Sequence, residues 1–198
     1  MTTTHVGRPL PPASPLTSDT IAKMQRLMGR YPEPRSALLP MLYLAQAEHG
    51  YVSRSAMIEI ASLLDLSPAE VAAVSTFYTM FKRSPCGTWL VSVCTNVSCD
   101  LAGGTKIFEA LKEALGPESG DITPDGLFTV EEVECLAACD GAPLLQINYE
   151  NYERITTEGA LALIESLKRG EVPPPTRGEK PKTSAETSHR LSCVEAKP

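Results

Sequence analysis

Several features that define large protein classes are missing from this sequence of 198 residues. No apolar run approaches the roughly 18 residues that a transmembrane helix needs, so we expect no direct membrane insertion. Residues 1–16 contain four prolines and no apolar core of the signal-peptide type, which predicts a disordered lead without targeting function. Lys and Arg number 18 against 24 Asp and Glu. Because phosphate backbones bind clustered cations, this acidic composition predicts no nucleic-acid partner.

Motifs of catalysis are also scarce. No G-x-G-x-x-G follows a predicted strand, so the chain lacks a dinucleotide-binding fingerprint. The three histidines, His5, His49 and His189, are scattered along the chain and accompany no Ser/His/Asp arrangement. We therefore predict no catalytic residues in this chain alone.

Residues 17–84 carry apolar side chains at helical spacing. The clearest helix start is at Ser67, where Pro68 and Glu70 follow at the positions of a capping box. Ser36 and Ser53 are the expected N-caps of two preceding helices. Four short helices with short connections predict a small helical bundle.

The remaining sequence falls into two parts. Residues 85–170 alternate between strand patterns and helical patterns, in the order strand, helix, strands, helix, which predicts a small α/β layer. The fold class is therefore α+β, with the helical bundle first. Residues 171–198 are polar and contain several prolines, so we expect a disordered tail.

Charge and cysteine are concentrated in the same segment. Residues 85–170 hold 5 basic and 14 acidic residues, a net charge of −9, and five of the six cysteines. The net charge is +2 over residues 1–84 and +1 over residues 171–198. The acidity therefore surrounds the cysteines instead of being spread over the chain.

Four of these cysteines form two close pairs, each after a predicted strand: Cys94 with Cys99, and Cys135 with Cys139. Buried structural thiols are disfavoured by the polar residues that flank the pairs, and disulfides by the missing signal peptide. Four thiolates can instead hold zinc or a [2Fe–2S] cluster. The C-x4-C and C-x3-C spacings favour the cluster slightly and leave zinc open.

Four longer motifs make the sequence recognisable. They are YPEPRSALLPMLYLAQAEHGYVS, LSPAEVAAVSTFYTMF, the VCTN…C pair and ECLAACDGAPLLQIN. With them the chain closely resembles the NuoE-type subunit of bacterial NADH–quinone oxidoreductase (respiratory complex I), a thioredoxin-like [2Fe–2S] protein. The resemblance covers about residues 20–168. One departure is Ala137, where the family usually has glycine in C-L-G-A-C; an αR or β backbone, or tolerated strain, is expected there.

The resemblance implies a function for the whole chain. Residues 85–170 would form a thioredoxin-like ferredoxin domain whose [2Fe–2S] ligands are Cys94, Cys99, Cys135 and Cys139. The helical part would clasp a flavin- and NADH-binding (NuoF-like) subunit, which holds FMN and NADH. The chain would then be an electron-transfer subunit of the enzyme, in contact with other peripheral-arm subunits. It would lie in the cytoplasm on the inner face of the cell membrane.

Other functions stay open. Related subunits occur in NAD-linked hydrogenases and formate dehydrogenases, and a four-cysteine zinc module that only shapes an interaction surface is a further alternative. Thiol–disulfide exchange fits less well, because neither pair has the C-x2-C spacing. If a cluster is present, we expect the neighbouring carboxylates to keep its potential low, near the roughly −400 mV of plant-type ferredoxins. These carboxylates are Asp100, Glu131, Glu132, Glu134 and Asp140.

Overall fold

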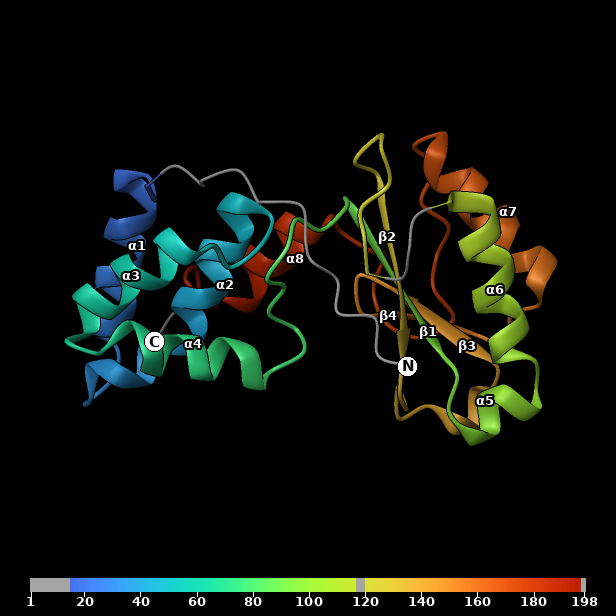
Figure 1. Ribbon diagram of the computed structural model, residues 1–198, viewed down its shortest axis with the longest axis horizontal. Coiled ribbons are helices and arrows are strands. Elements are labelled where there is room, and N and C mark those ends of the chain that lie inside the picture. Colours follow the sequence, from blue (N-terminus) through green and yellow to red (C-terminus); the bar gives the residue numbers. More distant parts are fainter. Residues whose placement is uncertain (1–14, 117–119, 197–198) are drawn as a thin grey trace. The chain divides into compact units, whose positions relative to one another are not determined.

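The computed structural model describes residues 15–116 and 120–196, and the chain divides into two compact units (Figure 1). The helical unit contains residues 15–84 and 188–196, and the sheet unit contains the described residues between 85 and 187. The lead expected over residues 1–16 lies almost entirely outside the described residues. Leu16, which is described, is buried.

The helical unit contains the predicted four helices. They are α1 (Ser18–Met28), α2 (Leu38–His49), α3 (Arg54–Leu64) and α4 (Pro68–Phe77). The capping box of α4 forms as expected: Ser67 Oγ accepts from the Glu70 N–H, and the Glu70 carboxylate accepts from the Ser67 N–H. Ser53 also caps α3. Ser36 does not cap α2, because a 3-10 turn, η1 (Pro34–Ala37), takes up that position.

A buried glutamine fixes the segment that leaves α4. The Gln46 amide donates to the Met80 carbonyl at 3.1 Å and accepts from the Lys82 N–H at 2.7 Å. Val52 N–H donates to the Lys82 carbonyl at 2.7 Å. Because buried polar groups need partners, these bonds specify one path for the chain as it leaves the helical unit.

The sheet unit contains one sheet of four strands. They are β1 (Trp89–Cys94), β2 (Phe128–Val133), β3 (Leu144–Ile147) and β4 (Glu150–Glu153), in the order β2-β1-β3-β4. β1 runs parallel to β2 and antiparallel to β3. Helices α6 (Gly104–Leu115) and α7 (Thr157–Lys168) pack together beside the sheet (Figure 1). This arrangement confirms the predicted α+β class.

One helix of the sheet unit escaped the sequence prediction. Helix α5 (Val97–Leu101) has five residues and begins after its N-cap, Asn96. A helix of this length is too short to show a hydrophobic period, so its sequence carries little sign of it. It matters because it carries Cys99.

The C-terminal segment corrects the expectation of a disordered tail over residues 171–198. Within its described part, to residue 196, it contains helix α8 (Ser184–Leu191), and Val194 is 2% exposed. The guanidinium of Arg30 donates to the carbonyls of Cys193 at 2.7 Å and Val194 at 2.6 Å. This segment contains few large apolar residues, so its composition predicted disorder. Its position is held instead by small side chains and by hydrogen bonds to its backbone.

A substitution at Val194 tests whether this segment stabilises the helical unit. Val194→Ala removes two buried carbon groups, so we expect the free energy of unfolding to fall by about 1.5–2 kcal/mol in urea titrations. Leu191→Ala is the matched control, because this side chain is 37% exposed. An equal, small change in both variants would contradict a docked C-terminal segment.

None of the helices in the described parts of the chain is both long and apolar enough to cross a membrane.

Candidate metal centre

The first cysteine pair lies where β1 ends. Cys94 is the last residue of the strand, Cys99 lies on α5, and each is 1% exposed. Gly104, the first residue of α6, lies against the backbone of both cysteines. A Cβ at this glycine would lie 2.5 Å from the Cys94 carbonyl oxygen and 2.9 Å from that of Cys99. Only glycine therefore allows the chain to close this turn around the two thiols.

The second pair follows β2 and is exposed to solvent. The sulfur atoms of Cys135 and Cys139 are 3.4 Å apart, and the Ala137 N–H donates to Cys135 Sγ at 3.3 Å. Ala137 has φ +59°, in the left-handed region. Of the conformations expected for it, the strained one is present. The strain, about 1–2 kcal/mol for an L-residue, accompanies a turn that points the amide at the sulfur.

The sheet brings the two pairs together. β1 and β2 are parallel neighbours with Cys94 paired to Val133, so both cysteine loops follow the strands at the same end of the sheet. Ala138, from the second loop, and Leu144 pack with Cys94 and Cys99 in a small buried cluster. All four predicted ligand positions therefore lie at or just beyond the carboxyl ends of two neighbouring parallel strands.

Electrostatics between the thiols opposes their ionisation. Burial and the thiol of Cys94 raise the pKa of Cys99 to about 11, although the Leu144 N–H acts in the opposite direction. The hydrogen bond with Cys135, and the charge of that residue, raise the pKa of Cys139. Four adjacent thiolates thus need positive charge between them, which bound metal supplies.

The thiol pairs offer the donor set of a dinuclear cluster. In residues 15–116 and 120–196, no three His, Cys, Asp or Glu side chains converge closely enough to hold one metal ion. A [2Fe–2S] cluster takes two thiolates at each iron. The chain offers two thiol pairs, with N–H donors from Ala137 and Leu144 to their sulfurs.

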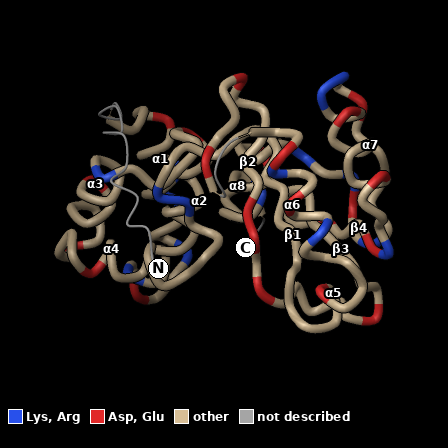
Figure 2. The backbone as a smooth tube through the Cα atoms, turned by 45° about the vertical axis from the view of Figure 1, so that its right-hand side comes forward, with Lys and Arg blue, Asp and Glu red and all other residues tan. Residues whose placement is uncertain are grey.

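Each carboxylate expected near the site accepts a hydrogen bond, and the acidic stretch at the end of β2 is visible in Figure 2. Glu131 accepts from Ser92, Glu132 from Thr95, Glu134 from Asn96 and Asp100 from Thr105. The partner of Asp140 is a cation: Arg177 donates to it at 3.0 Å and holds its pKa below the usual value. No local pattern indicated this contact, because the two residues are 37 positions apart.

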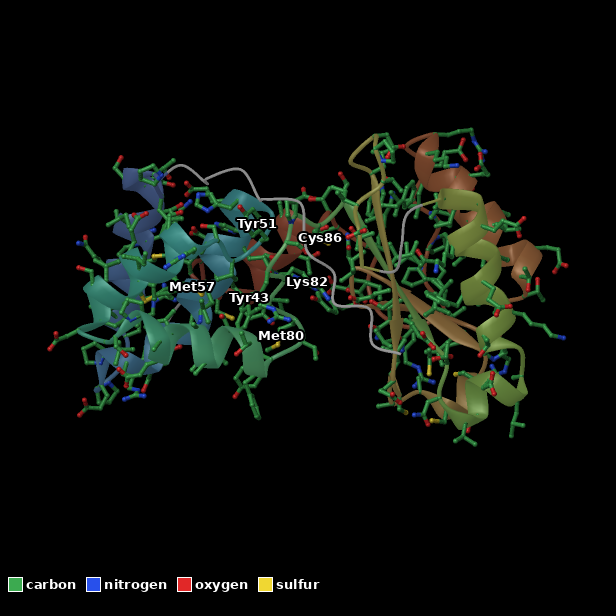
Figure 3. All side chains as sticks on the ribbon, viewed as in Figure 1. Tyr43, Tyr51, Met57, Met80, Lys82 and Cys86 are labelled. Carbon is green, nitrogen blue, oxygen red and sulfur yellow. The ribbon has the colours of Figure 1, made fainter. Side chains whose placement is uncertain are left out.

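The two other cysteines lie elsewhere. Cys86, labelled in Figure 3, precedes β1, and Cys94 is the last residue of that strand, whose two ends are about 17 Å apart at about 3.3 Å per residue. Cys193 is exposed in the C-terminal segment of the helical unit. Neither was predicted to be a ligand.

The model of the thioredoxin-like [2Fe-2S] ferredoxin family matches residues 24–168. The chain belongs to this family. The match confirms the predicted family and the thioredoxin-like fold of the sheet unit.

Two relatives are similar over most of the chain. The chain is 44% identical over 164 residues to an NADH-quinone oxidoreductase subunit of Mycobacterium tuberculosis, a match that covers 81% of this chain and 65% of that protein. It is 38% identical to NADH-quinone oxidoreductase subunit 2 of Thermus thermophilus, over 74% of this chain and 83% of that protein. This chain thus spans slightly less than two thirds of the length of its mycobacterial relative.

A solved structure is similar as well. In a crystal structure of an NAD+-reducing [NiFe]-hydrogenase, one chain superposes with a TM-score of 0.60 and 26% identity. The similarity covers 67% of this chain and 23% of that chain.

Proposed function

We propose that this chain is an electron-transfer subunit of an NADH–quinone oxidoreductase. It carries one [2Fe–2S] cluster on Cys94, Cys99, Cys135 and Cys139. The observation that carries the proposal is the position of two thiol pairs after the carboxyl ends of the neighbouring parallel strands β1 and β2, in a chain of this family.

The cluster, when bound, stores one electron at a time. The chain's own residues do the rest: β1 and α5 bury one thiol pair away from water, and Ala137 and Leu144 donate N–H groups to sulfur. Such donors stabilise the added negative charge and raise the potential, whereas the surrounding carboxylates lower it.

A partner must supply the electron, since the sequence offers no nucleotide-binding fingerprint. A flavin- and NADH-binding subunit, NuoF-like, with FMN and NADH bound, fits this role. The names of the relatives support an assembly of this kind. The chain then functions in the peripheral arm of the complex, with other subunits of that arm, in the cytoplasm on the inner face of the cell membrane.

A second candidate has a specific observation in its favour. The superposition on a chain of an NAD+-reducing hydrogenase fits an equivalent subunit of such an enzyme. Purifying the native complex and identifying its subunits separates the two: membrane-arm subunits support the first function, and a hydrogenase subunit supports the second.

The cluster itself is tested on the purified full-length chain. We expect a reddish-brown protein with about two iron and two sulfide per chain and an EPR signal after reduction by dithionite. A colourless protein with stoichiometric zinc would overturn the proposal in favour of a zinc-stabilised interaction module.

A further inference from the structure

A strap of the C-terminal segment, residues 173–179, extends the free edge of the sheet. Thr176 N–H donates to the Asn151 carbonyl at 2.8 Å, and Asn151 N–H donates to the Arg177 carbonyl at 3.1 Å, so the strap adds to the outer strand β4. Tyr152 Oη donates to the Pro173 carbonyl at 2.7 Å. The strap begins after residue 168, where the match to the family model ends.

The path of the strap is fixed by a glycine. Gly178 has φ +111°, and a Cβ there would lie 1.9 Å from Glu150 Oε2. The same oxygen accepts from the Glu179 N–H at 3.0 Å. The strap therefore turns tightly around a side chain of β4, which holds the preceding residue, Arg177, at one place on the sheet edge.

Arg177 joins this edge to the second cysteine loop. Its Nη2 lies 3.0 Å from Asp140 Oδ2, and its Nε lies 2.9 Å from Glu153 Oε1. Asp140 directly follows Cys139 in the turn η2 (Cys139–Gly141). The side chain of Glu153 is 8% exposed and packs on the backbone of Gly141, where a Cβ would lie 2.6 Å from its carboxyl carbon. One guanidinium thus bridges a carboxylate of this turn, Asp140, and a carboxylate of β4, Glu153.

A second arginine, Arg154, donates hydrogen bonds to the backbone carbonyls of the same turn. Arg154 Nη2 donates to the Asp140 carbonyl at 3.0 Å, and the Arg154 N–H donates to the Gly141 carbonyl at 2.8 Å. The turn is therefore fixed from β4 even without Arg177. What Arg177 adds is a positive charge at the carboxylate next to Cys139.

We propose that Arg177 acts on the cluster site through its charge, by offsetting the negative charge of Asp140 beside Cys139. The inference rests on the proposed function, with Cys139 as a ligand. A cation beside a cluster favours the state with one more electron, since Coulomb attraction to the added charge lowers its energy. Arg177 therefore raises the reduction potential above the value that the acidic surroundings alone would set.

The test is a redox titration of the full-length chain at low salt, in which the EPR signal measures the reduced cluster at each potential. In Arg177→Gln we expect the ratio of reduced to oxidised cluster, at the midpoint potential of the wild type, to fall about threefold; this is a shift of about 30 mV at 59 mV per tenfold. The effect is modest because the Arg177 side chain is 53% exposed and screened by water. Asp140→Asn, which removes the negative partner, should move the ratio in the opposite direction.

Two controls separate charge from structure. Arg177→Lys keeps the charge and should titrate like the wild type. Arg169→Gln removes a cation of similar exposure, 57%, at the far end of α7, and should not shift the midpoint. An unchanged midpoint in Arg177→Gln and Asp140→Asn, or an equal fall in Arg177→Lys, would overturn the role of Arg177. A wild-type chain without a cluster would instead overturn the proposed function.

Discussion

Replacement of Cys135 by alanine is expected to abolish the [2Fe–2S] absorption and EPR signal. This thiol is exposed and lies 3.4 Å from Cys139 Sγ, so its loss leaves one iron with a single protein ligand. Alanine is preferred to serine, because a serine hydroxyl keeps an oxygen donor at the site. Iron and sulfide content, measured on protein purified without oxygen, gives the result directly.

The control for this variant is available in the same chain. Cys193→Ala also removes an exposed thiol, but from the helical unit, and should keep the full cluster signal. Cys86→Ala should keep it as well. An intact signal in Cys135→Ala would show that the ligand set is wrong, and loss in Cys193→Ala would point to an additional ligand.

The second large effect is expected for Gly104→Ala. The new Cβ would overlap the carbonyl oxygens of Cys94 and Cys99, both of which are backbone atoms that cannot rotate away. Overpacking of this kind costs about 1–3 kcal/mol, and relief requires the first thiol pair to move. We therefore expect a lower melting temperature together with a large loss of bound iron.

Gly29→Ala is the matched substitution, because a Cβ at Gly29 meets its nearest atom at 3.7 Å, an ordinary contact. It should leave both the melting temperature and the iron content close to those of the wild type. If Gly104→Ala also kept both, the close approach of α6 to the cysteine turn would have no role in shaping the site.

Local signals in the sequence were sufficient where one short motif determines one element. The capping box at Ser67 predicted the start of α4, and the β-branched run before Cys94 predicted β1. Each cysteine pair was also expected to follow a strand, and the two strands that precede the pairs are parallel neighbours in the sheet.

The parts that the sequence did not predict depend on contacts between distant residues. Ser36 is a good N-cap residue, yet η1 replaces it, since tertiary packing outweighs a preference worth about 1 kcal/mol. Helix α8 is polar and its buried side chains are those of Thr187 and Ser188, so no apolar pattern in the sequence predicts it. Arg177 looked like one more charge in a polar tail, and nothing local to it indicated Asp140.

The two thiol pairs of the candidate site differ in their exposure to water. Cys94 and Cys99 are closed off from water, while Cys135 and Cys139 face it. In the proposed cluster site, iron, chelators and oxidants would therefore approach from the side of the second loop, the one that Arg154 and Arg177 contact. Assembly and damage of the proposed cluster would then both begin at this loop, and the residues that hold the loop would influence both.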